Sequence, residues 1–164
     1  MEKNNNQRFP SIFEYTKEFS VVLVFLVIDQ IIKLSASQLT SIKVLIPDFL
    51  QLNYVKNYGV AWSMFNNKMS FIIVFSLIAI GYLFYILKQY REHIIIHFGL
   101  LMMIGGAFGN LIDRMFRGYV VDYIDVMIFG YDFPVFNVAD VLLVCGVIVI
   151  FIETFRKVKN GETI

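Results

Sequence analysis

The chain has 164 residues, of which 58% are hydrophobic and only 16% are charged, whereas about a quarter of the residues in a typical soluble domain are charged. A formal net charge of +1 provides no clustered basic face for nucleic acid, and a single cysteine permits neither an internal disulfide nor a cysteine-based metal site. Composition therefore excludes an ordinary soluble domain and predicts a protein of the lipid bilayer.

Four segments are apolar and long enough to cross a bilayer core of about 30 Å. They are predicted at residues 19–35, 69–87, 94–112 and 138–155. Ser35-Ala36-Ser37 after the first segment is similar to a signal-peptide cleavage site, but Asp29 and Lys33 do not suit the apolar region of a signal peptide, so we expect an uncleaved span. The predicted fold is an all-α membrane protein, a bundle of four transmembrane helices forming one domain over residues 1–164.

Lysine and arginine are denser in three segments than in the two remaining loops. Because positive charge marks the cytoplasmic side of a membrane protein, both termini are predicted to be cytoplasmic, with loops 36–68 and 113–137 on the outer face. The charges that set this orientation are Lys3, Arg8 and Lys17 before the first span, Lys88 and Arg91 between the second and third, and Arg156, Lys157 and Lys159 after the fourth.

Both outer loops contain candidate strands. Residues 42–65 are rich in β-branched and aromatic residues and include Pro47 and Gly59, while residues 127–136 are typical of a hairpin that turns at Gly130 to Asp132. We therefore expect a small β-sheet that forms an extracytoplasmic cradle at one end of the bundle.

The ionisable residues near the spans gather at the predicted outer boundary. A carboxylate in mid-bilayer costs about 2.5–3.5 kcal/mol on insertion scales, so such residues are rarely incidental. One end of the bundle would collect Asp29, Lys33, Asn110, Asp113, Arg114, Asp122, Asp125 and Asp140. This distribution indicates a site rather than a pore.

Several of these residues have a structural explanation. Asp29 and Lys33 lie four residues apart on one helical face, so we interpret them as a pair that neutralises its own burial. Asp113 and Arg114 fit a helix-end ion pair as well as a functional role, and Asp140 fits a helix N-cap. The glycines Gly105, Gly106 and Gly109 favour close helix packing, and Cys145 is expected to pack in the same way.

Asp122 has no such structural explanation. Two carboxylates that approach each other at a partly desolvated boundary share a proton, because both cannot ionise easily. If Asp122 and Asp140 meet, they form a dyad of the aspartic-protease type. His93 and His97 have a spacing that suits a metal, but we interpret them as interfacial residues at the start of a helix, so no metal site is predicted.

Five motifs, in order along nearly the whole chain, resemble the conserved boxes of the lipoprotein signal peptidase family. They are Asp29-Gln30 with Lys33, then Asn57 with Gly59 and Ala61-Trp62, then Gly105 to Arg114, then Val120-Val121-Asp122-Tyr123, and finally Phe136-Asn137-Val138-Ala139-Asp140. Val60 and Tyr123 replace the family's usual Ala and Phe, which bears on substrate fit rather than on chemistry.

The resemblance implies a bacterial inner-membrane enzyme that cuts prolipoproteins before a diacylglyceryl-modified cysteine. It implies Asp122 and Asp140 as the catalytic dyad, and it implies neither a metal nor an organic cofactor. From the residues themselves we expect a structural polar role for Asp29, Lys33 and Asp113, and we expect a monomer in contact with membrane lipids. The residues that would bind substrate or orient the dyad are Asn57, Gly59, Asn110, Arg114 and Asn137. Two alternatives remain: a small proton-coupled transporter using the aspartates, although relays usually lie near the midplane, and a non-catalytic scaffold.

Overall fold

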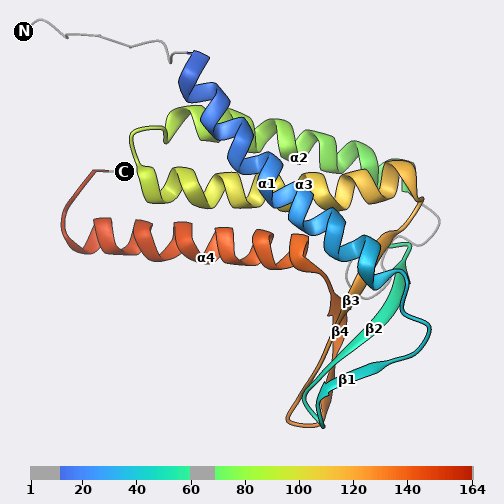
Figure 1. Ribbon diagram of the computed structural model, residues 1–164. Helices are drawn as coiled ribbons and strands as arrows, with labels where there is room; N and C mark the ends of the chain where they lie inside the picture. Colours follow the sequence, from blue (N-terminus) through green and yellow to red (C-terminus); the bar gives the residue numbers. More distant parts are fainter. Residues whose placement is uncertain (1–11, 60–68, 164) are drawn as a thin grey trace, which may run out of the picture.

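The computed structural model describes residues 12–59 and 69–163, and side chains from residue 15 onward. Its helices are α1 (Ile12–Ala36), α2 (Met69–Gln89), α3 (Ile94–Phe116) and α4 (Val138–Lys159), which form the bundle in Figure 1. All four are long and apolar enough to cross a membrane. The predicted four-helix membrane fold is therefore confirmed.

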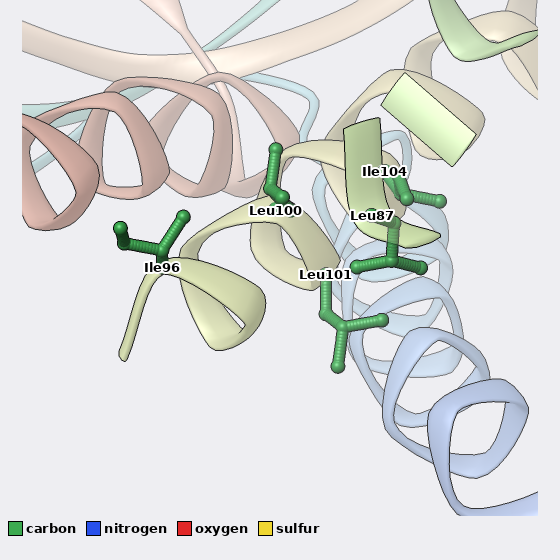
Figure 2. Close-up of a cluster of buried hydrophobic side chains, with 5 residues drawn as sticks. All are labelled: Leu87, Ile96, Leu100, Leu101 and Ile104. Atoms are coloured by element: carbon green, nitrogen blue, oxygen red, sulfur yellow. The ribbon is translucent and has the colours of Figure 1, made fainter. Parts of the chain in front are cut away.

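Helix α3 lies at the centre of the bundle and is the most buried of the four, because α1, α2 and α4 all pack against it. One end of its core is a cluster of aliphatic side chains, drawn in Figure 2: Leu87, Ile96, Leu100, Leu101 and Ile104. Lipid tails are as apolar as these side chains, so helices in a membrane associate through close packing and polar contacts rather than through hydrophobic burial alone.

Glycines supply the close packing. A Cβ atom on Gly146 of α4 would lie 2.6 Å from the carbonyl oxygen of Gly99 in α3, and one on Gly106 would overlap the carbonyl oxygen of Ala139. Gly109 faces Asp29 in the same way, with 2.6 Å from its hypothetical Cβ to Oδ2. The predicted packing role of these small residues agrees with the contacts, and it places α1 and α4 directly on the polar end of α3.

The two outer loops combine into one antiparallel sheet with the order β1-β2-β3-β4. Its strands are β1 (Lys43–Ile46), β2 (Leu50–Asn57), β3 (Val120–Ile128) and β4 (Tyr131–Phe136). Pairing of β2 with β3 joins loops that α2 and α3 separate in sequence. Residues 60–65 of the predicted strand region, including Val60, Ala61 and Trp62, lie outside the described residues.

The second hairpin turns earlier than the sequence predicted. Phe129 and Gly130, rather than Gly130 to Asp132, connect β3 to β4, and their φ angles are 50° and 81°. Two consecutive residues with positive φ are the usual requirement of a tight two-residue hairpin, and the glycine meets half of it without strain.

All four helices extend beyond their predicted bounds. Helix α1 begins at Ile12 instead of residue 19, and α2 ends at Gln89 instead of residue 87. Helix α3 continues to Phe116, so Asp113 and Arg114 belong to its last turns, and α4 continues to Lys159. A hydropathy pattern detects only the apolar part of a span, whereas the polar turns at its ends stay helical where their side chains find partners.

The sheet lies at the end of the bundle where α1 ends and α4 begins (Figure 1). The start of α1 and the end of α4 lie at the opposite end. The polar residues predicted to gather at one boundary are therefore brought to the junction between the helices and the sheet.

Candidate active site

Asp122 projects from β3 and is almost completely buried, with 2% of its surface exposed. Its Oδ2 accepts a hydrogen bond from Asn57 Nδ2 at 2.9 Å, and its Oδ1 accepts one from Asn137 Nδ2 at 2.6 Å. Burial raises the pKa of Asp122 to about 6, and the nearby charge of Asp140 acts in the same direction, while the bond from Asn57 opposes them. A carboxyl with this pKa is protonated in part of the population near neutral pH.

Asp140 lies in the first turn of α4 and belongs to a capping box. The side chain of Asn137 accepts from the backbone N–H of Asp140 at 3.0 Å, and Oδ2 of Asp140 accepts from the backbone N–H of Asn137 at 3.1 Å. The other carboxylate oxygen, Oδ1, accepts from Asn110 Nδ2 at 2.8 Å. The N-cap is therefore Asn137 and not Asp140, which was predicted for that position and is instead the N3 residue of the capping box. This position leaves Oδ1 directed toward α3.

Two asparagine amides connect the carboxylates. Asn137 donates to Asp122 and also to Asn110 Oδ1, the latter at 3.1 Å, and Asn110 in turn donates to Asp140. The Asn110 oxygen also accepts from Lys33 Nζ at 3.0 Å. A continuous chain of hydrogen bonds thus links β3, α3, α4 and α1, and fixes the two carboxylates relative to each other.

Both carboxylates line one cavity of about 510 Å³. Its polar wall comprises Asn57, Asn110, Arg114, Asp122 and Asp140. Its apolar wall comprises Val120, Phe133, Pro134, Val135, Phe136, Val141, Val144 and Cys145. The sequence placed Cys145 among ordinary packing residues, whereas here the thiol side chain lines the cavity. A cavity with one polar and one apolar wall suits a ligand that combines a peptide with hydrocarbon.

Arg114 lines the cavity, and one of its nitrogens has no hydrogen-bond partner among the described residues. Its Nη2 donates to the carbonyl oxygen of Gly59 at 3.1 Å and its Nη1 to that of Asn110 at 3.3 Å. Its Nε is buried and has no hydrogen-bond partner among the described residues. Since an unsatisfied buried donor is costly, this atom is suited to a ligand oxygen.

Two of the candidate substrate-binding residues lie behind the cavity rather than in its wall. Asn137 is 0% exposed and uses its amide on Asp122 and Asn110, and Gly59 is also buried. The Gly59 N–H donates to Asn57 Oδ1 at 3.0 Å, and its carbonyl holds Arg114. Both residues therefore position other side chains of the site.

The structural polar residues form a second buried network, which joins the first through the bond from Lys33 to Asn110. Lys33, 0% exposed, is 2.9 Å from Asp29 Oδ2 and 3.0 Å from Asp113 Oδ2. Asp29 Oδ1 accepts from the backbone N–H of Ala139 at 3.0 Å, directly before Asp140. Asp113 Oδ2 accepts from the backbone N–H of Val121 at 3.1 Å, directly before Asp122. One lysine and two aspartates thus hold the backbone next to each carboxylate of the site.

Two members of this network, Arg117 and Gln30, were not among the predicted site residues. Asp113 pairs with Arg117 as well as Lys33, instead of forming the considered pair with Arg114. Gln30 Nε2 donates to Asp113 Oδ1 and Asp29 Oδ2, both at 3.2 Å. The spacing of Asp113 and Arg117, four residues apart on one helix, was the available signal for that pair.

The part of the chain that the structure describes contains no group of three or more His, Cys, Asp or Glu side chains placed to hold a metal. His97 Nε2 lies 3.2 Å from Glu18 Oε1, and His93 Nδ1 lies 2.9 Å from Lys157 Nζ, at the end of the bundle away from the sheet. The chemistry available in the cavity is therefore that of two neighbouring carboxyl groups, which can act together as acid and base.

Comparison with known proteins agrees with this geometry. Residues 21–156 match the family model of signal peptidase (SPase) II. Lipoprotein signal peptidases from Staphylococcus aureus strains JH9 and Newman are 37% identical to the chain over 149 residues, covering 87% of this chain and 90% of theirs.

Two solved structures of bacterial membrane enzymes share the fold. One has a TM-score of 0.81 and 32% identity over 91% of this chain and 93% of its own, and the other a TM-score of 0.76 and 34% identity over 85% and 92%. The family model matches most of this chain, and the relatives from Staphylococcus aureus are 37% identical to it. This chain therefore belongs to the signal peptidase II family.

Proposed function

We propose that this membrane peptidase removes the signal peptide from lipid-modified prolipoproteins, cutting before the diacylglyceryl-cysteine, with Asp122 and Asp140 as its catalytic dyad. The observation that carries the proposal is that these two carboxyls line one cavity and are joined through the amides of Asn110 and Asn137. Membership of the signal peptidase II family supports the reaction class.

The pair shares one proton, and the burial that raises the pKa of Asp122 to about 6 favours Asp122 as the carboxyl that carries it. The ionised Asp140 takes a proton from a water molecule, whose oxygen attacks the carbonyl carbon of the scissile peptide bond. Protonated Asp122 donates a hydrogen bond to the carbonyl oxygen and stabilises the charge that develops there. When the tetrahedral intermediate collapses, the leaving nitrogen receives the proton that was taken from water.

The two walls of the cavity divide the recognition of substrate. Arg114 Nε and the amides of Asn57 and Asn110 would hold carbonyl groups of the extended peptide beside the dyad. The apolar wall on α4, with Val141 and Val144, would contact the signal sequence or the acyl chains of the modified cysteine. A lipid-anchored peptide could thus reach the dyad without leaving the bilayer.

The enzyme works as a monomer surrounded by lipid, with both termini in the cytoplasm and the sheet on the extracytoplasmic face. The lysine and arginine distribution supports this orientation. The transporter alternative finds no support, because the carboxylates gather at one end of the bundle in a network of fixed partners, rather than along a path through it.

The proposal is tested by incubating purified protein with a lipidated prolipoprotein and measuring the shortened product by gel mobility. Asp122→Asn and Asp140→Asn should each abolish cleavage, because an amide cannot exchange the required proton. Asp125→Asn is the matched control: Asp125 is also a buried β3 carboxylate, but its partners are Gln51 and Asn53 of the sheet and it does not line the cavity. Near-normal turnover in either dyad variant would refute the assignment.

A further inference from the structure

The free end of the sheet is apolar and exposed, although it lies outside the membrane-spanning helices. We call this region the sheet tip and define it as residues 44–49 and 127–132, where the two hairpins turn. The turns are adjacent, since the backbone N–H of Met127 donates to the carbonyl oxygen of Phe49 at 2.9 Å. Exposed apolar side chains of the tip are Val44, Leu45, Ile46, Phe49, Met127, Ile128, Phe129 and Tyr131.

Phe129 is the extreme case. It occupies the β3–β4 turn with φ 50°, its side chain is fully exposed, and Ile128 and Tyr131 on either side of the turn are also exposed. A bulky residue with positive φ is uncommon in a tight turn, where Asn or Gly serves better. The local backbone therefore does not explain why a phenylalanine occupies this position, whereas a contact with something outside the chain would explain it.

The position of the sheet indicates which contact this is. Figure 1 shows the sheet leaving the bundle at the helix ends and running across the helix direction, so that the tip lies beside the bundle rather than beyond it. If the four helices span a bilayer, a sheet that runs across their direction at one end of the bundle lies along the membrane surface there.

We propose that the sheet tip inserts into the membrane leaflet and anchors the sheet to the lipid surface. Aromatic and aliphatic side chains at headgroup depth are typical of such contacts. The tip contains Asp48 and Asp132 but no lysine or arginine, so apolar burial rather than attraction to anionic lipid drives the contact. A zwitterionic bilayer is therefore sufficient.

The anchor has a consequence for the candidate site. Strand β4 runs from the tip at Tyr131 to the cavity, where Phe133 and Phe136 form part of the apolar wall. Fixing one end of this strand in the leaflet holds the cavity at the level of a lipid-anchored peptide. This second step rests on the proposed function, whereas the insertion itself does not.

Insertion is tested by depth-dependent quenching. Phe129→Cys in a Cys145→Ser background is labelled with a small fluorophore and reconstituted in phosphatidylcholine nanodiscs, with Ser41→Cys before β1 as the control position. We expect doxyl groups near the headgroup to quench the label at 129 more strongly than aqueous iodide does. Strong quenching by iodide alone would overturn the proposal, as would protection from both quenchers, which would indicate a protein partner.

The consequence for delivery is tested separately with Phe129→Asp and the matched control Phe129→Leu. Phe129 does not line the cavity. We expect Phe129→Asp to cleave a bilayer-embedded prolipoprotein several-fold more slowly than Phe129→Leu, and to cleave the same substrate in detergent at an equal rate. Equal rates in the bilayer would refute a role in delivery, while no cleavage by the unmodified enzyme would refute the proposed function and leave the depth result standing.

Discussion

Asp122 is the residue in which burial and function conflict most directly. Its carboxyl is enclosed by β2, β3 and the start of α4, and it accepts two amide hydrogen bonds that favour the charged form. The burial that separates it from water favours the neutral form and is the larger effect, so its pKa rises from 3.8 to about 6. The folded enzyme thus keeps a proton on this group at a pH where an ordinary aspartate has lost it.

This pKa predicts how stability changes with pH. A carboxyl whose pKa is higher in the folded state stabilises the fold fully below its unfolded value of 3.8, and this contribution is lost as pH rises through about 6. We therefore expect the melting temperature of the wild type to fall as pH rises over this range, in addition to any pH dependence that other groups contribute. Asp122→Asn should remove that part of the slope, and Asp125→Asn should retain it. If the plots of melting temperature against pH were parallel for all three proteins, the assignment of this pKa to Asp122 would be wrong.

The same proton should shape the rate. Only the singly protonated pair is active in the proposed mechanism, so the initial rate should rise and then fall with pH, and the falling limb should lie well above 3.9, the usual value for aspartate. The two limbs belong to the pair, so Asp→Glu at position 122 or 140 should shift both. A rate that stays flat into alkaline pH, with chemistry limiting, would exclude the shared proton.

At the scale of elements, the ion network holds the site in register. Lys33 of α1 bridges Asp29 and Asp113, and these aspartates bind the backbone N–H groups of Ala139 and Val121, each one residue before a dyad carboxylate. The helices therefore place the dyad through backbone contacts that do not involve the reacting atoms.

Asp29→Ala should act through stability. Removing Asp29, one of the two carboxylates that pair with Lys33, leaves part of the buried lysine charge uncompensated. Loss of one partner from a buried ion pair typically costs about 3–5 kcal/mol of stability. We expect a lower melting temperature and yield, with substantial cleavage per folded molecule, because Asp113 still pairs with Lys33. Asp132→Ala, an exposed aspartate of β4, is the control and should melt like the wild type. A stable but inactive Asp29→Ala would place Asp29 among the catalytic residues.

A second element-scale prediction concerns the contact of α3 with α4. A Cβ on Gly106 would overlap the carbonyl oxygen of Ala139 and lie 3.1 Å from Leu143 Cγ, so Gly106→Ala should push the start of α4 away from α3. Overpacking of this kind costs about 1–3 kcal/mol and would shift Asp140 relative to Asp122, lowering both melting temperature and turnover. Gly81→Ala in α2, where a Cβ meets nothing within 4 Å, should change neither.

The helices and the sheet differ in how far the sequence predicts them. Hydropathy alone located four spans, because a continuous apolar run has one stable arrangement in lipid. The pairing of β2 with β3 was not predictable, since it joins two loops separated by α2 and α3. The local sequence indicated that Asp140 lies at the start of α4, but it assigned the N-cap to Asp140 instead of Asn137. The Asn110–Asn137 bridge and the contact of Lys33 with Asp113 depend on three helices meeting, which spacing cannot show.

At the scale of the whole molecule, the buried polar network and the sheet occupy one end of the bundle, while the other end carries six of the eleven lysines and arginines of the described residues. A peptidase built this way has one working face, so its orientation decides which pool of substrate it meets. The charge bias predicts that the working face lies outside.

That orientation is tested by cysteine labelling in intact cells with a membrane-impermeant maleimide, in a Cys145→Ser background. Thr40→Cys, exposed between α1 and β1, should be labelled, whereas Lys159→Cys, exposed at the end of α4, should react only after the membrane is permeabilised. The two sites lie at opposite ends of the bundle, so each serves as the control for the other. The reverse pattern would place the dyad on the cytoplasmic side. It would show that the lysine and arginine distribution predicts the wrong orientation for this protein. Labelling of both sites in intact cells would mean that the protein inserts in two orientations, and that only part of the population has its working face outside.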